Sequence, residues 1–166
     1  MSQHLDDCWD AVAQPYGARH FSAFAIEIAC GPSGGKMLLV KTSLSPSPIH
    51  GNGLFAAEDI AKGTDMWQFR EGFDLEKAPA EVDSLPAVAQ DWFKRYGYLD
   101  HHFNQWILSF DDARFINHSE DPNMRPDYNR HRCAVGIASR NIAKGEEITI
   151  DYREIENSSW LSAATK

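Results

Sequence analysis

The sequence predicts a mainly β domain that also contains helix, and three observations support this prediction. Short apolar runs rich in β-branched residues alternate with glycine and proline, and one pattern of strand, turn and strand occurs twice. Only residues 83–97 combine helical periodicity with residues that start and end helices. The chain has 166 residues, 43% of them hydrophobic, so we expect one sizeable core and one domain.

Residues 1–36 predict an N-terminal extension with a helix and a strand. Apolar residues within positions 5–12 follow helical spacing for barely two turns. The runs FSAFAIEIA at 21–29 and KMLLVKTSL at 36–44 have the composition of strands. The intervening CGPSGGK is typical of a flexible turn, so the two runs predict a hairpin.

The clearest helix is expected over residues 83–97, where the sequence reads DSLPAVAQDWFKRYG. Asp83 or Ser84 can cap its start, and Gly97 can end it. Five apolar residues fall on one face of this helix: Leu85, Val88, Ala89, Trp92 and Tyr96. We expect that face to lie on a sheet. The preceding residues 70–82 show no sustained period and predict a connection.

The frame of Ala, two residues, Asp or Asn, and then Ile-Ala-Lys-Gly occurs within residues 55–69 and again within 137–151. In each copy a glycine, Gly63 or Gly145, can close a tight turn between two strands. The Asp or Asn side chain is available to accept hydrogen bonds from local backbone amides. Two copies do not make a repeat array, so the sequence predicts two similar β-hairpins.

The charge balance bears on the partners of the protein. With 24 acidic and 16 basic residues the net charge is −8, which argues against direct binding to nucleic acid. This charge allows attraction to a basic protein or peptide, although acidic residues also serve simply to keep a protein soluble. The sequence has no apolar run long enough to span a membrane and no export signal, so we expect no membrane partner and a cytoplasmic location.

The cysteines and histidines do not predict a metal site. Cys8, Cys30 and Cys133 are widely spaced and form no paired motif, so neither a disulfide framework nor a zinc cluster is expected. The histidines at 101, 102 and 131 also lack the spacing of metal ligands. We therefore expect no metal.

Three polar motifs carry the candidate chemistry. In SPIHGNGLF, two glycines flank Asn52 and allow a ligand to approach the backbone closely. In RFINHSEDPN, Asn117 and His118 follow two large apolar residues and need partners for their polar groups. In GEEITIDY, apolar and polar residues alternate in a strand that ends at Tyr152. Taken singly, these motifs are more simply a turn, a pair satisfied by neighbouring backbone, and a core tyrosine.

The order of the three motifs changes this interpretation. GNGLFAAEDIAKG, RFINHSEDPN and GEEITIDY together resemble the SET domain of protein lysine methyltransferases, from Leu39 to Tyr152. The resemblance implies a β-clip-like SET fold, with several small twisted sheets around a knot-like crossing and a helical insert at about 83–97. The chain looks most like compact bacterial or viral-type members without zinc-binding flanking segments. We expect an extension at 1–36, the SET domain at 37–152 and a short tail at 153–166.

Residue by residue, the resemblance implies a site for S-adenosylmethionine. Four residues match the loop whose backbone holds the methionine end: Gly51, Asn52, Gly53 and Leu54. Asn117 matches the residue whose amide binds the methionine amino group, and His118 the one whose backbone meets the adenine. Tyr152 matches the catalytic tyrosine. We also hypothesise that Trp160 in the tail closes over the adenine or the substrate channel, the alternative being a disordered terminus.

The candidates for the substrate channel are Trp106, Ile150 and Tyr128. Trp106 falls near where relatives often carry a channel tyrosine, and core packing is an equally open interpretation. Ile150 stands where relatives often carry Phe or Tyr, and the missing hydroxyl there predicts capacity for di- or trimethylation. Tyr128 or Tyr98 can instead supply a hydroxyl from elsewhere.

The resemblance implies an S-adenosylmethionine-dependent protein lysine N-methyltransferase. Its expected substrate is a basic protein tail, such as that of a histone or histone-like protein, which would place the protein near the nucleus or nucleoid rather than in the general cytoplasm. A non-catalytic SET-fold module that binds peptides, or a methyltransferase acting on a different amine, stays open. The apolar content fits either a monomer or a homodimer.

Overall fold

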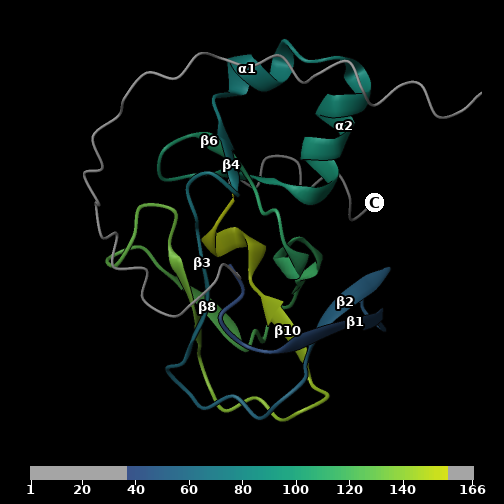
Figure 1. Cartoon of the computed structure of the whole chain (residues 1–166), viewed down its shortest axis with the longest axis vertical. Coiled ribbons are helices and arrows are strands. Elements are labelled where there is room, and N and C mark those ends of the chain that lie inside the picture. The colour runs from purple at the N-terminus through teal and green to yellow at the C-terminus, as the bar shows by residue number, and fades with distance from the viewer. Residues whose placement is uncertain (1–36, 157–166) are drawn as a thin grey trace, which may run out of the picture. The chain divides into compact units, whose positions relative to one another are not determined.

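The computed structural model describes residues 37–156, and within this range the expected mainly β class is confirmed (Figure 1). The strands are β1 (Thr42–Pro46), β2 (Asn52–Ala56), β3 (Asp65–Gln68), β4 (Leu75–Lys77), β5 (Tyr98–Asp100), β6 (Gln105–Leu108), β7 (Asn117–His118), β8 (Met124–Asp127), β9 (Val135–Ala138) and β10 (Glu147–Ile150). The helices are α1 (Pro79–Asp83), α2 (Ala87–Tyr96) and the short 3-10 helices η1 (Asp112–Phe115) and η2 (Tyr152–Glu154).

The strands form two sheets, and β10 is the strand that joins the polar motifs. The larger sheet has the order β1-β2-β10-β8-β9-β3, with β7 also paired to β10. Strand β10 is antiparallel to β2 but parallel to β7 and β8. It therefore lies between the glycine motif on β2 and the Asn-His motif on β7. The smaller sheet has the order β4-β6-β5.

The two Ile-Ala-Lys-Gly copies do not form two separate hairpins, so that prediction was wrong. Strand β2 of the first copy pairs with β10 of the second, and β3 of the first copy pairs with β9 of the second. Between them, Ile60 and Ile142 exchange backbone hydrogen bonds of 2.8 and 2.9 Å. The copies are thus interlocked, because each one supplies the pairing partner that the other lacks.

The turns of the two copies are also linked by hydrogen bonds from one copy to the other. Gly63 donates its N–H to Ala138 O and Gly145 donates to Ala56 O, each over 2.8 Å. Both glycines have positive φ, 84° and 86°, as the sequence predicted. The Asp and Asn side chains act across the copies rather than locally: Asp59 accepts from the Lys144 N–H, and Asn141 accepts from the Lys62 N–H.

Replacing Ile142 by alanine is expected to lower the free energy of unfolding by about 2–4 kcal/mol. The Ile142 side chain is only 1% exposed at the centre of the interlocked turns, so its truncation leaves a cavity that the paired backbone cannot fill. Denaturant unfolding of Ile142→Ala measures this effect. Ile49→Ala is the matched control because Ile49 is 51% exposed, and equal losses in the two variants would contradict the packing argument.

The helical segment differs from the prediction at its start and in its buried face. Helix α2 ends at Gly97 as expected, but it begins after Pro86, so neither Asp83 nor Ser84 caps it. The residue that it buries is Phe93, which packs against the smaller sheet, while Val88 is 83% exposed and Trp92 is 51% exposed. The expected apolar stripe is therefore only partly confirmed: Leu85 and Tyr96 pack in the cluster around Phe93, but Val88 and Trp92 do not. The helix does lie on a sheet, beside β6 (Figure 1).

Residues 70–82 were predicted as a connection, but they contain regular structure, so this prediction was also wrong. They contain β4 and most of α1, which is too short to show periodicity. Strand β4 gains its partner only from β6, which follows some thirty residues later. Of the predicted N-terminal hairpin, the run at 21–29 lies outside the described residues, and β1 begins only at Thr42.

The main core lies beneath the larger sheet and around the interlocked turns. Its fully buried members include Leu54, Met66, Ile107, Ile142 and Ile148. Cys133 is a free, buried thiol, and burial raises its pKa to about 11. Within residues 37–156 no helix is long and apolar enough to cross a membrane. No cluster of His, Cys, Asp or Glu in the described range could hold a metal ion.

Candidate functional site

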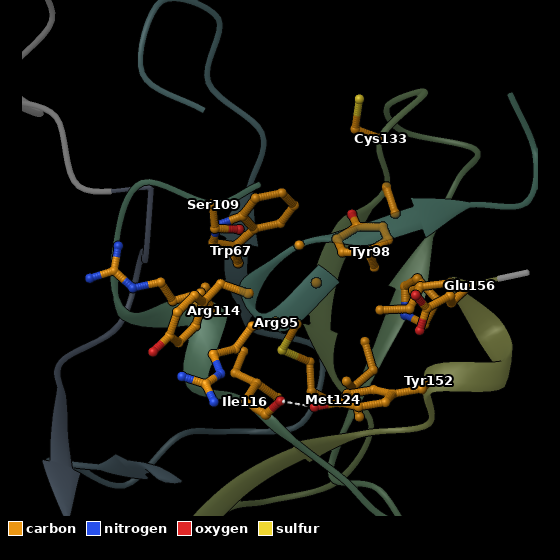
Figure 2. A pocket seen from close by; sticks show the side chains of 18 of the residues that line it. Trp67, Arg95, Tyr98, Ser109, Arg114, Ile116, Met124, Cys133, Tyr152 and Glu156 are labelled. Carbon is orange, nitrogen blue, oxygen red and sulfur yellow. Dashed lines mark hydrogen bonds between the residues drawn. The ribbon is translucent and has the colours of Figure 1, made fainter. Parts of the chain in front are cut away.

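A cavity of about 130 Å3 lies between the two sheets and is lined by residues from α2, η1, β8, β10 and η2 (Figure 2). Its walls include Ile150 and Tyr152, two residues that the sequence assigned to the site, and also Tyr98. Met124 and Ile116 add apolar surface from neighbouring strands and loops. Most of the cavity surface is therefore apolar, but phenol groups and four charged residues also line it: Lys94, Arg95, Arg114 and Glu156.

Tyr152 is fixed at the end of β10 by bonds to the Asn-His motif. Its hydroxyl donates to the Ile116 carbonyl over 2.8 Å, and its backbone N–H donates to His118 Nδ1 over 3.1 Å. Asp151 begins η2 by accepting from the Arg153 N–H, which turns the chain immediately after the strand. Burial, with a smaller contribution from the Glu156 carboxylate, raises the pKa of Tyr152 to about 12. The phenol is therefore a neutral hydrogen-bond donor at physiological pH.

Asn117 gathers the glycine motif into the same region. Asn117 is only 8% exposed. Its Nδ2 donates to the carbonyls of His50 and Asn52 and to Glu147 Oε1. The donor-acceptor distances are 3.1, 3.2 and 2.8 Å in that order. An amide nitrogen carries two hydrogens, so these acceptors share them. No hydrogen bond to Asn117 Oδ1 is found within residues 37–156, which leaves an acceptor for another group.

The two glycines of the motif are required for different reasons. Gly51 has a φ of +51°, a conformation that side chains with a Cβ rarely adopt. At Gly53 a Cβ would overlap the carboxylate of Glu147, which is held by Asn117 and by the Ser47 hydroxyl. The missing Cβ thus makes room for a fixed carboxylate beside the loop, a contact that the sequence did not suggest.

Asn123, the last residue of RFINHSEDPN, holds the motif to β10. The residue is 1% exposed, and its Nδ2 donates to Glu146 Oε1 and to the Glu147 carbonyl. Its Oδ1 accepts from the Thr149 N–H over 2.9 Å. Both polar groups of its side chain are used inside the protein, so Asn123 has a structural role.

The structure brings the sequence-assigned residues together in two adjacent groups. Gly51, Asn52, Gly53 and Asn117 form the loop group, while Ile150 and Tyr152 line the cavity. The two groups meet where Ile116, which accepts from Tyr152, precedes Asn117 in the chain. Leu54 is 0% exposed within the core, so only its backbone in β2 belongs to the loop group.

Other sequence-assigned residues lie away from the cavity. Trp106 packs against Phe93 with ring centroids 6.4 Å apart, which fits the core-packing alternative. Tyr128 donates its hydroxyl to Asp100 Oδ2 over 3.0 Å and is not among the cavity walls, whereas Tyr98 is. Trp160 and most of the proposed tail lie outside the described residues, so the lid stays a prediction.

Several residues of the site were not identified from the sequence. The sequence identified Glu147 only as a polar position of an alternating strand. Its carboxylate accepts a hydrogen bond from Asn117 and occupies the space that a Cβ at position 53 would need. The Ile116 carbonyl and the Glu156 side chain also face this region, and neither carries a sequence signal. The contacts of Glu147 and of the Ile116 carbonyl arise because β10 pairs with both β2 and β7.

Sequence comparison places the chain among proteins of one family. A family model of the SET domain matches residues 51–153, more than half of the chain. Histone-lysine N-methyltransferase 2D of Homo sapiens is 28% identical over 113 residues, which cover 66% of this chain and 2% of that protein. Histone-lysine N-methyltransferase trithorax of Drosophila virilis is 29% identical over 122 residues, covering 64% of this chain and 3% of that protein. The chain thus spans only a small part of these relatives.

Solved structures support the same fold. A Plasmodium falciparum protein described as a histone methyltransferase is 22% identical, with a TM-score of 0.50, and the match covers 73% of this chain and 97% of that chain. A humanized mutant of the Chaetomium thermophilum Polycomb Repressive Complex 2, bound to an inhibitor, is 25% identical with a TM-score of 0.50. That match covers 71% of this chain and 16% of the other.

Proposed function

The chain belongs to the SET domain family, and from this premise we propose that it is an S-adenosylmethionine-dependent protein lysine N-methyltransferase. One observation carries the proposal: the Tyr152 hydroxyl and the Ile116 carbonyl meet in an apolar cavity, directly beside the loop group around Asn117. This arrangement supports a reaction between an amine entering the cavity and a cofactor held by the loop.

The loop group fits the methionine end of S-adenosylmethionine, whose polar groups are an ammonium and a carboxylate. The Asn117 Oδ1 and the Glu147 carboxylate are acceptors suited to the ammonium, and the open backbone at Gly51 and Gly53 allows close approach. His118 would contribute through its backbone, since its Nδ1 is already engaged by Tyr152. When bound, the cofactor supplies a sulfonium methyl group.

The residues of the chain would position and desolvate the amine. A lysine amine has an ordinary pKa of about 10.4, and only its neutral form is nucleophilic. The apolar walls formed by Ile116, Met124 and Ile150 disfavour the ammonium and so favour the reactive form. The carbonyl of Ile116 can accept a hydrogen bond from the amine, and Tyr152 orients that carbonyl. No side chain is required to act as a general base, because the proton can leave before the amine enters.

We propose di- or trimethylation as the product, because Ile150 offers no hydroxyl to retain a water in the cavity. Tyr98 lines the same cavity and could supply that hydroxyl. Burial raises the pKa of Tyr98 well above its ordinary value, so its hydroxyl stays protonated. Mass spectra of products from the wild type and from Tyr98→Phe would separate the contributions of the two positions.

The proposed substrate is a basic protein such as a histone or histone-like protein. The net charge of −8 supports long-range attraction to such a protein. The matched relatives are named as histone-lysine methyltransferases, which favours the same class. Both arguments concern the substrate as a whole rather than the residues around its target lysine.

The proposal is tested by methyl transfer from labelled S-adenosylmethionine to a mixture of histones and other basic proteins. The modified residue and its number of methyl groups are then identified by mass spectrometry. Label on lysine supports the proposal, and label on another residue or on a small amine would replace it with a different methyltransferase. Tight cofactor or peptide binding without transfer to any substrate would favour the binding-module alternative.

The rate of transfer is expected to rise with pH up to about pH 10, following deprotonation of the substrate amine. Tyr152 does not oppose this rise: its raised pKa of about 12 means that the donor hydroxyl is fully present below pH 10 and is lost only as pH rises through 12. A pH profile of kcat/KM for a lysine peptide measures this. A descending limb well below pH 10 that disappears in Tyr152→Phe would contradict it.

A further inference from the structure

The wall of the cavity is locally basic although the chain as a whole is acidic. Lys94, Arg95 and Arg114 line it, against the single carboxylate of Glu156. We propose that these cations bind an anionic side chain next to the target lysine of the substrate. This inference rests on the proposed function, which it deepens by naming the local sequence that the site prefers.

The three cations have no acidic partner among the described residues, and they are the only unpaired Lys or Arg residues of that range that line the cavity. Lys62, Arg70, Arg125 and Lys144 also lack an ion pair within that range, but they do not line the cavity. Arg130 pairs with Asp65, Arg132 with Glu76, Arg140 with Glu146 and Arg153 with Asp151. Within residues 37–156 no ion pair involves Lys94, Arg95 or Arg114, although acids outnumber bases in the chain. Their positive charge is therefore available to a ligand at the cavity.

The cations are held at the cavity by two different elements. Arg114 is anchored on η1, since its Nη1 donates to the Phe110 carbonyl over 3.1 Å and its Cζ lies 5.1 Å from the centre of the Phe115 ring. Lys94 and Arg95 belong to the last turn of α2 and are exposed. Figure 2 shows the Arg95 and Arg114 side chains on one side of the cavity, with Tyr152 and Glu156 on the other.

Trp67 gives a second indication that this cavity receives a hydrogen-bond acceptor. The residue lines the cavity and is 6% exposed, and its Nε1 is the only buried side-chain nitrogen or oxygen of the described residues without a partner. A buried donor left unpaired costs about 1–3 kcal/mol. A carbonyl or carboxylate of a bound peptide would remove that cost.

This charge distribution sets the direction in which a peptide enters. The target amine belongs near Tyr152, while a flanking carboxylate or phosphate belongs near Arg95 and Arg114. A flanking Lys or Arg would meet like charge and be disfavoured. The net charge of −8 still attracts basic proteins to the molecule as a whole. The basic wall of the cavity would then select which lysine of such a protein is methylated.

The test uses peptides acetyl-Ala-Ala-X-Lys-X-Ala-Ala-amide in which X is Gln, Glu, phosphoserine or Arg. Both kcat/KM for methyl transfer and the Kd for binding to the full chain with S-adenosylmethionine are measured. We expect the Glu and phosphoserine peptides to exceed the Gln peptide about tenfold, and the Arg peptide to fall below it. Comparing Glu with phosphoserine distinguishes a carboxylate from a phosphate as the natural group.

Two charge-reversal variants test whether the basic wall of the cavity causes the preference for acidic peptides. Arg95→Glu should remove the preference for Glu and raise the Arg peptide above the Gln peptide, whereas Lys62→Glu, with the same change of charge on an exposed residue away from the cavity, should leave the order unchanged. Equal transfer to Gln and Glu peptides would overturn the inference and leave the proposed function standing. Preferential binding of Glu peptides without transfer would support the inference and overturn the function.

Discussion

Tyr152→Phe is expected to lower kcat for methyl transfer by about 100- to 1000-fold. The variant keeps the ring in its apolar surroundings but removes the hydroxyl that donates to Ile116 O over 2.8 Å. Without that bond the carbonyl and the reacting amine lose their fixed orientation, while the loop group around Asn117 is untouched. Cofactor affinity should therefore change little. The measurement is single-turnover transfer together with calorimetric titration of S-adenosylmethionine.

Tyr128→Phe is the matched control for this prediction. It removes the same hydroxyl from a residue that bonds Asp100 and does not line the cavity. We expect it to keep kcat and to lose about 1–2 kcal/mol of stability, since buried Asp100 loses a donor. If Tyr152→Phe retained full activity, or if both variants lost it equally, the assignment of Tyr152 to the reaction would be wrong.

Asn117→Asp is expected to lower the free energy of unfolding by about 3–5 kcal/mol at neutral pH. The size of the side chain is preserved, but the donor that serves His50 O, Asn52 O and Glu147 Oε1 is replaced by a second carboxylate. Two carboxylates at this distance cannot both be charged without a large cost, so one retains its proton and its pKa rises. The affinity of the Asn117→Asp variant for S-adenosylmethionine should also be lower than that of the wild type.

The pH dependence of this variant follows from the raised carboxyl pKa. The variant is destabilised least at low pH, where the proton shared by the two carboxylates is bound, and its stability is lost as pH rises through the raised pKa. The difference in free energy of unfolding between the variant and the wild type should therefore shrink on acidification toward about pH 5. Urea unfolding of both proteins at several pH values measures this. Asn129→Asp, at an exposed position, should change stability little at any of them. A deficit that does not depend on pH would contradict the paired-carboxylate explanation.

The motif residues could be predicted because their constraints are local. Gly51 needs positive φ, and Gly63 and Gly145 close tight turns. The alternation in GEEITIDY predicted the apolar face of β10 with Ile148 and Ile150, although Thr149 on its other face is buried as well. These properties depend on a few neighbouring residues, so they can be identified in a single sequence. The order of the motifs along the chain then carried the resemblance to the SET domain, and the family match over residues 51–153 confirms that resemblance.

The errors concern pairing between distant segments. The two Ile-Ala-Lys-Gly copies were expected to fold on themselves, but pairing across the copies satisfies both sets of backbone groups in the centre of the core. Helix α2 buries Phe93 rather than the face of Val88, because the position of β6 decides which side of the helix is covered. Local periodicity contains no information about where such a partner lies.

The sequence by itself determined the mainly β class, the turn glycines and the identity of Asn117 and Tyr152 as site candidates. Only the tertiary structure decided that Glu147 lies against Gly53, that the Ile116 carbonyl receives the Tyr152 hydroxyl, and that an acidic chain has a basic cavity wall. The physical reason is that each of these contacts joins residues far apart in the chain. They are created by the pairing of β10 with both β2 and β7 and by the packing of α2 beside β6, not by any local pattern.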